Sequence, residues 1–146
     1  MPDKVKLEVF TLSIEDLELP LSTVKLLKSV SSFYKDTDNR EAIMRVYKNN
    51  PNLFLIAEDK GKIVGSVLGQ GDGRIGFVWS LAVLPNEQGK GIGKKLMIEI
   101  ESRLKKMGCV GICLFTGKEK KAAVNLYKTL GYVISKKPFV MNKAKL

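Results

Sequence analysis

The first third of the chain changes from strand-like alternation to helical spacing. Polar and apolar residues alternate over residues 4–10, which predicts a strand. Apolar residues then recur at helical spacing after Ser13, a suitable helix cap, and Pro20 is expected to interrupt or restart that helix. A second, shorter helix is predicted to begin at Asp38, with Glu41 closing a capping box.

Three strands separated by tight turns are predicted in the middle of the chain. The apolar-rich segments are residues 53–58, 63–70 and 75–84. Turn-forming residues lie between them, at 59–62 and at 71–73. Because strands joined by such short turns run antiparallel, the pattern predicts an antiparallel meander.

The second half of the chain alternates between helical and strand patterns. A glycine-rich loop after Pro85 leads into a long helix that ends near Met107, where Gly108 is a natural cap. The stripe expected to be buried on this helix consists of Leu96, Met97, Ile100, Leu104 and Met107. The order of elements from residue 75 onward predicts an α/β layered domain with a mixed sheet.

The elements after this helix are predicted to be a strand, a helix and one or two last strands. A buried strand is expected over residues 110–116 and a helix over 119–130, stopped by Gly131. The last strands are expected at residues 132–134 and 139–141.

Composition indicates one soluble domain. Hydrophobic residues make up 45% of the 146 residues, which is enough for one core. No apolar run approaches the ~20 residues of a membrane span, and the first residues lack the apolar stretch of a signal peptide. We therefore expect a cytoplasmic protein that does not enter a membrane.

The two cysteines predict neither a disulfide nor a metal site. Cys109 and Cys113 lie four residues apart, a span of ~13 Å along a strand, which is too long for a disulfide. The chain contains no histidine, the commonest metal ligand and general base. We interpret both thiols as small hydrophobic side chains in or near the core and expect no bound metal.

The formal net charge of +10 favours a polyanionic partner without saying which one. Nucleic acid, a membrane surface and a phosphorylated cofactor are all compatible with it. The chain shows no recognisable nucleic-acid-binding motif, and its aromatic residues are not clustered with the basic ones. We therefore expect no nucleic acid partner.

The loop after Pro85 carries the most specific signal. Three glycines, Gly89, Gly91 and Gly93, lie where a strand is followed by a helix. The first amides of a helix lack internal acceptors and carry partial positive charge, so they attract a phosphate group. The spacing fails both the P-loop pattern and the dinucleotide-binding pattern.

A third pattern, Gln/Arg-x-x-Gly-x-Gly/Ala, fits Gln88, Gly91 and Gly93. Here the sequence resembles the GNAT superfamily of N-acetyltransferases. The preceding Leu-Ala-Val-x-Pro of residues 81–85 looks like that family's fourth strand. Residues 123–132 look like its second signature, a helix that ends in Leu-Tyr-x-x-Leu-Gly-Tyr. The clear resemblance covers residues 75–134.

The resemblance implies a fold, a cofactor and a reaction. The fold would be a single α/β (α+β) domain over residues 1–146, with a mixed, mostly antiparallel sheet of about six or seven strands and about four helices. The cofactor would be acetyl-CoA, and its acetyl group would pass directly to a primary amine. The acceptor would be a small molecule or a peptide or protein, and a homodimer is compatible with the family.

The resemblance also assigns roles to residues. The Leu81 N–H would polarise the thioester carbonyl, and the Tyr127 hydroxyl would serve as the general acid. Tyr127 otherwise reads as a packing residue, and the loop lysines as solvated side chains. The residues expected to bind the cofactor are Leu81, Ala82, Val83, Gln88, Gly89, Lys90, Gly91, Ile92, Gly93, Lys94, Lys120 and Tyr127.

Two departures from the family pattern bear on the chemistry. Some subfamilies place a Glu or His base where this chain has Phe77 and Trp79, which should share a face with Leu81 by strand alternation. The base would then be a water chain, a carboxylate from elsewhere, or absent. Lys120 stands where many members have Asn.

Two alternatives follow from the missing base. A non-catalytic acyl-CoA-binding module of the same fold would keep the glycine loop and lack turnover. If the protein is instead an enzyme, Phe77 and Trp79 either line the acceptor pocket or pack in the core.

Overall fold

A computed structural model describes residues 8–11, 39–136 and 141. The described residues form two compact units, one that ends at Phe115 and one that begins at Thr116. The helix predicted after Ser13 lies outside the described residues, as does most of the strand predicted at residues 139–141. None of the described helices is long and apolar enough to cross a membrane.

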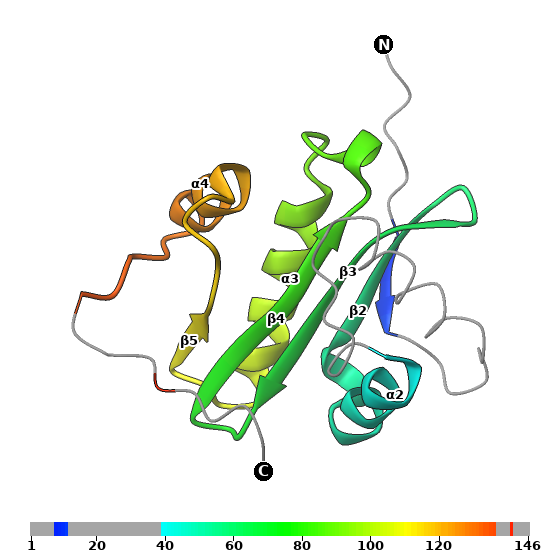
Figure 1. The fold of residues 1–146 in the computed structure, drawn as a ribbon. Helices are drawn as coiled ribbons and strands as arrows, with labels where there is room; N and C mark the ends of the chain where they lie inside the picture. Colours follow the sequence, from blue (N-terminus) through cyan, green and yellow to red (C-terminus); the bar gives the residue numbers. More distant parts are fainter. Residues whose placement is uncertain (1–7, 12–38, 137–140, 142–146) are drawn as a thin grey trace. The chain divides into compact units, whose positions relative to one another are not determined.

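The first unit is built on one sheet whose five described strands follow chain order (Figure 1). The strands are β1 (Glu8–Thr11), β2 (Phe54–Asp59), β3 (Lys62–Gly71), β4 (Ile75–Val83) and β5 (Gly111–Leu114). Neighbouring strands from β1 to β4 are antiparallel, and β5 pairs with β4 in parallel. The predicted meander and the mixed, mostly antiparallel sheet are therefore confirmed, although the described sheet has fewer strands than the six or seven expected.

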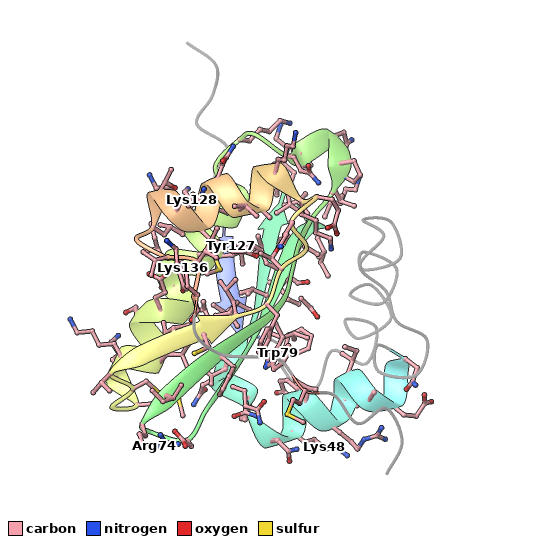
Figure 2. All side chains as sticks on the ribbon, turned by 60° about the vertical axis from the view of Figure 1, so that its left-hand side comes forward. Lys48, Arg74, Trp79, Tyr127, Lys128 and Lys136 are labelled. Atoms are coloured by element: carbon pink, nitrogen blue, oxygen red, sulfur yellow. The ribbon has the colours of Figure 1, made fainter. Side chains whose placement is uncertain are left out.

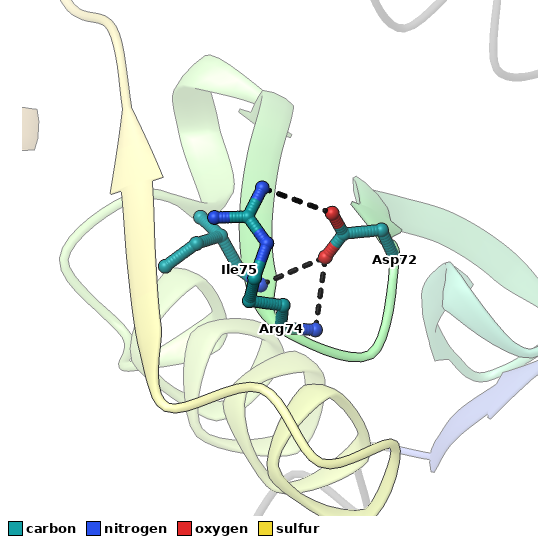
Figure 3. A network of polar contacts seen from close by, with 3 residues as sticks. All are labelled: Asp72, Arg74 and Ile75. Carbon is teal, nitrogen blue, oxygen red and sulfur yellow. Dashed lines mark hydrogen bonds and ion pairs between the residues drawn. The ribbon is translucent and has the colours of Figure 1, made fainter.

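The two turns of the meander form as their residues predict. Lys60 and Gly61 both have positive φ, 50° and 77°, in the turn from β2 to β3. In the turn from β3 to β4, the Asp72 carboxylate accepts hydrogen bonds from the Arg74 and Ile75 amides, each at 2.9 Å (Figure 3). These bonds, with the Arg74 guanidinium at 3.3 Å, hold the pKa of Asp72 below its ordinary value.

Helix α2 (Arg40–Asn49) begins later than predicted. Its N-cap is Asn39, whose side-chain oxygen accepts a hydrogen bond from the Ala42 amide at 2.9 Å. Glu41 is in the first turn, where its charge favours the helix dipole. The expected capping box is wrong, because the third helical position belongs to Ala42 and not to Glu41. A short 3₁₀ helix, η1 (Pro51–Leu53), leads from α2 into β2.

The two faces of the sheet are covered by different helices (Figure 1). On one face, Ile43 and Tyr47 of α2 pack with residues of β2, β3 and β4, namely Phe54, Ile56, Leu68 and Ala82. Helix α3 (Ile92–Lys106) packs on the other face, where Gly69 leaves room for Ile100 and Gly76 for Leu104. Helices α2 and α3 thus pack against opposite faces of the sheet.

The stripe predicted on α3 is buried except at its end. Leu96, Met97, Ile100 and Leu104 have no exposed surface, whereas Met107 is 43% exposed. Met107 caps the helix, and Gly108 follows with φ 98°, so the chain turns away before this side chain can reach the core.

Strand β5 is shorter and more exposed than predicted. It covers Gly111–Leu114, while Val110 before it is 88% exposed and Cys113 within it is exposed. The interpretation of Cys113 as a core residue is therefore wrong, and Cys109 is only half-buried. Among the described strands, β5 pairs with β4 alone, so its apolar run is not enclosed on both sides.

The second unit contains helix α4 (Lys121–Thr129), close to the helix predicted there. Gly131, with φ 91°, follows the end of the helix as expected. Residues 132–134 are not a strand, so the prediction of a strand there is wrong. The described chain thus has three α-helices, where about four were expected, together with η1 and a second 3₁₀ helix, η2 (Pro85–Glu87).

Candidate cofactor-binding site

Strand β4 extends beyond its pairing with β5. The parallel ladder runs from Ile75 opposite Gly111 to Val78 opposite Leu114 and stops there. Strand β4 continues to Val83. Within the described sheet, residues 79–83 therefore have no strand partner on the β5 side, which leaves backbone groups free for a ligand.

A bulge interrupts β4 within this unpaired stretch. The register to β3 changes from Leu68 opposite Trp79 to Ser66 opposite Ala82, so β4 carries one extra residue. Ser80 has φ 53°, a value that a residue with a side chain rarely adopts. Ser66 and Leu68 are two residues apart and share a face of the sheet. Residues directly opposite each other also share a face, so their partners Ala82 and Trp79 lie on that same face. The expectation that Leu81 would share that face is wrong, because the bulge resets the alternation.

The loop after β4 is tied back to the strand that precedes it. The side-chain amide of Gln88 donates a hydrogen bond to the Val83 carbonyl at 3.0 Å. Gly89 and Gly91 have φ values of 79° and 84°, which glycine adopts without strain. A Cβ at either glycine would meet no atom within 4 Å, so the backbone of the loop is open to an approaching group.

Helix α3 starts at this loop without a side-chain cap. Its N-cap is Gly91, which has no side chain to accept a hydrogen bond from the first amides, and its first turn contains no acidic residue. The first amide to find a backbone acceptor is that of Lys95, which donates to the Gly91 carbonyl at 3.1 Å. In the described part of the chain, the amides from Gly89 to Lys94 have no acceptor. They present a positive helix end that is suited to a phosphate.

Charged side chains around the loop are partly paired. The Lys90 ammonium lies 2.8 Å from the Glu87 carboxylate, and Lys94 and Lys95 are exposed on the first turn of α3. An exposed pair of this kind contributes little to stability. The cation nearest the glycines is thus already partly neutralised, and the backbone amides are the more specific feature.

Three aromatic rings gather where β4 and β5 separate. Phe77 and Trp79 are stacked with ring centroids 6.1 Å apart, and Phe115 lies 5.6 Å from Trp79. Figure 2 shows Trp79 projecting from the α2 side of the sheet. Trp79 and Phe115 are each one residue beyond the last paired residues, Val78 and Leu114.

Two of the predicted site residues belong to the second unit. Tyr127 is half-buried in α4, its ring 5.8 Å from that of Tyr132, and burial raises the pKa of its hydroxyl. Lys120 is the N-cap residue of α4, and its amide donates to the Gly117 carbonyl at 3.1 Å. The structure therefore brings together the predicted residues from Leu81 to Lys94, and Lys120 and Tyr127 are described apart from them.

Three features of the site were not predicted from the sequence. They are the bulge at Ser80, the hydrogen bond between Gln88 and Val83, and the place of Phe115 beside Trp79. A serine inside an apolar strand carries no local signal for a bulge. Phe115 could have been noticed as an aromatic residue at the end of a predicted strand, but its neighbour depends on strand register.

Sequence relatives of the chain are acetyltransferases. Over 90 residues it is 39% identical to an acetyltransferase of Pectobacterium atrosepticum, a match that covers 62% of this chain and 64% of that protein. Over 101 residues it is 34% identical to an acetyltransferase of Sodalis glossinidius, covering 69% of this chain and 71% of that protein. The first match thus spans just under two thirds of the relative's length.

A solved structure and a family model also match the chain. The NatC complex, solved bound to Gag peptide and CoA, contains a chain that matches with a TM-score of 0.80 at 25% identity, covering 89% of this chain and 86% of that one. The model of the acetyltransferase (GNAT) family matches residues 21–132. With its open glycine loop at the start of α3 and its partly unpaired β4, this chain belongs to the acetyltransferase (GNAT) family.

Proposed function

We propose that the protein transfers the acetyl group of acetyl-CoA to a primary amine. The observation that carries this proposal is the run of amides from Gly89 to Lys94, which have no acceptor among the described residues and follow directly on the part of β4 that β5 does not pair. Every helix leaves its first four amides without internal acceptors, but here no side chain caps them and the run extends back to Gly89 and Lys90. The family match supports the same reading.

The residues of this loop fit a pyrophosphate. The two glycines with positive φ have open space where a Cβ would lie, so phosphate oxygens can approach the backbone closely. Lys94 and Lys95 add positive charge on the same turn. The hydrogen bond from Gln88 to Val83 holds the loop against the end of β4, which fixes the distance between the anion site and the strand.

The unpaired strand fits the reacting end of the donor. Acetyl-CoA supplies a thioester whose carbonyl carbon an amine can attack. The Leu81 amide, next to the bulge at Ser80, is proposed to donate a hydrogen bond to the carbonyl oxygen as negative charge develops on it. The Ala82 and Val83 backbone is proposed to hold the arm that leads to the thioester.

Protons must move in both directions during the transfer. The amine loses a proton as its nitrogen bonds to the carbonyl carbon, and the sulfur gains one as the carbon–sulfur bond breaks. The Tyr127 hydroxyl is proposed to supply the proton to sulfur. A tyrosine hydroxyl, with an ordinary pKa of about 10, is protonated at neutral pH, which is the state a general acid requires, and burial raises the pKa of Tyr127 further.

The test is acetyl transfer to a panel of primary amines and peptides, measured as CoA released. Because Cys113 is exposed, CoA should be separated by chromatography and not detected with a thiol reagent. The proposal predicts amine-dependent CoA release by the wild-type protein. Binding of acetyl-CoA without turnover on any acceptor would instead favour the non-catalytic acyl-CoA-binding module.

A further inference from the structure

The three rings described above form a continuous apolar surface, which we call the aromatic shelf (Phe77, Trp79 and Phe115). Phe77 and Trp79 lie nearly parallel, with an angle of 20° between their planes, and Phe115 is tilted by 34° against Trp79. Beside Trp79 on the same face of the sheet, its cross-strand partner Leu68 is buried in the core. Phe77 and Trp79 are therefore held by strand β4, and Phe115 directly follows the last residue of β5.

Much of the shelf faces solvent. Trp79 is 42% exposed and Phe115 is 57% exposed. Large aromatic rings gain considerable free energy when they are covered, and adjacent exposed rings are characteristic of a binding surface. The shelf is also continuous with the proposed acetyl-transfer site, because Trp79 begins the unpaired stretch of β4 that contains Leu81.

The strands that carry the shelf lack charge. Neither β4 nor β5 contains a carboxylate, a lysine or an arginine, and the chain has no histidine. An acceptor lying here meets an apolar wall and receives no base from these strands. An amine that is already partly neutral at pH 7 needs a base least, so such an acceptor suits this surface best.

This condition favours one class of amine. A peptide α-amino group has a pKa of about 7.7–8.0 and a lysine side chain one of about 10.4. At pH 7 about a tenth of the α-amine is neutral, against roughly 0.04% of the lysine amine, a difference of about 300-fold that follows from these pKa values.

We propose that the shelf binds the first side chain of a peptide acceptor, and that the protein acetylates the α-amine of peptides that begin with a large apolar residue. This inference rests on the proposed acetyltransferase function. The apolar side chain would cover the exposed faces of Trp79 and Phe115, and the α-amine beside it would face the β4 backbone near Leu81.

A peptide series that differs only in its first residue tests the proposal. Peptides beginning with Phe, Leu, Ala, Asp or Lys are compared by kcat/KM, together with an Nα-acetylated peptide that has one internal lysine. Phe and Leu peptides should exceed the Ala peptide by about tenfold or more, since each tenfold corresponds to about 1.4 kcal/mol of apolar burial. The peptide with only a lysine amine should be the poorest acceptor.

Phe115→Ala separates the shelf from the rest of the site. Because Phe115 is mostly exposed, its truncation should leave the protein folded and the affinity for acetyl-CoA unchanged. It should lower kcat/KM for the Phe peptide about tenfold and leave the Ala peptide nearly unaffected. Ile98→Ala, an exposed apolar truncation on α3, is the matched control and should change neither.

Fluorescence provides a reading that does not depend on turnover. Trp79 is the only tryptophan in the chain, so its emission reports directly on the shelf. With CoA present, Phe and Leu peptides should change the emission saturably, and the Asp peptide should not.

The outcomes separate the two proposals. Absence of CoA release with every amine, while Trp79 still responds to apolar peptides, would remove the enzymatic function and keep the shelf. Turnover without preference for the first residue would overturn the shelf proposal alone. The same would follow from a preference for the lysine amine or for small apolar amines over peptides, or from an equal effect of Phe115→Ala on all peptides.

Discussion

The glycines at the start of α3 combine an unusual backbone conformation with open space. At Gly91 the φ of 84° would strain any other residue, yet an added Cβ would touch nothing within 4 Å. Gly61, in the turn from β2 to β3, shares both properties, with φ 77° and no neighbour. The two positions therefore differ mainly in their place in the fold, since Gly91 begins α3 and Gly61 lies in a turn, and this makes Gly61 a control for Gly91.

Gly91→Ala and Gly61→Ala should each lower the free energy of unfolding by about 1–2 kcal/mol, the cost of left-handed backbone for a residue with Cβ. Only Gly91→Ala should also weaken acetyl-CoA binding, by about tenfold, since its methyl group occupies the side from which phosphate approaches. Urea denaturation and calorimetric titration of both variants measure the two effects. Equal loss of affinity in the two variants would argue against a cofactor site at this loop.

Tyr127 is predicted to act in proton transfer and not in binding. Tyr127→Phe should lower kcat by about 10²–10⁴-fold, the range for loss of a general acid, with little change in the acetyl-CoA Kd. A tyrosine hydroxyl stays protonated as pH rises through neutrality, and burial moves the pKa of Tyr127 still higher. The wild-type kcat should show no loss attributable to this group until the pH exceeds about 10, the unperturbed value. A variant as fast as wild type would remove this role.

At the scale of elements, the bulge in β4 is the feature that most affects the site. It places Ala82 on the face of Trp79, and it lies where the strand loses its β5 partner. Ser80 adopts φ 53° at this point. A conformation that is unfavourable for a residue with a side chain persists only if the rest of the structure maintains it.

Two substitutions at Ser80 should differ in their effect on stability. Ser80→Val should lower the free energy of unfolding by about 1–2 kcal/mol, because left-handed backbone is least suited to a β-branched residue. Ser80→Gly should be neutral or slightly stabilising. Urea denaturation of both variants measures the difference. If valine were tolerated and glycine destabilising, β4 would be a regular strand at this position.

The elements that were predictable are those whose pattern is local. The alternation and turns of β2, β3 and β4, and the stripe and closing glycine of α3, are signals within a few residues. The exposure of β5 was not predictable, because an apolar run does not reveal whether a second strand will cover it. The bulge at Ser80 arises from the match between two strands, which neither sequence segment shows alone.

The candidate site also contains residues that a local pattern predicts and a residue that only the tertiary structure places. The loop from Gln88 to Gly93 was predicted from its motif, because a backbone that approaches an anion closely favours glycine at fixed positions. The aromatic shelf was only half anticipated, through Phe77 and Trp79. Phe115 joins them through the register of β5 on β4, which is a tertiary property.

At the scale of the whole molecule, the net charge and the amides at the start of α3 should contribute differently to the binding of acetyl-CoA. The net charge of +10 attracts any polyanion, and this attraction weakens as salt screens it. The amides of Gly89 to Lys94 are oriented donors and should discriminate among anions. Acetyl-CoA affinity should therefore fall with ionic strength while its preference over ATP remains.

The measurement that tests the central claim most directly is calorimetric titration of the purified protein with acetyl-CoA. Controls are ATP, CoA lacking its 3′-phosphate, and two glutamate variants, Gly91→Glu at the loop and Gly61→Glu with the same backbone strain. The account predicts saturable 1:1 binding that is lost in Gly91→Glu and kept in Gly61→Glu. No binding by the folded wild-type protein, or equal binding by both variants, would contradict it.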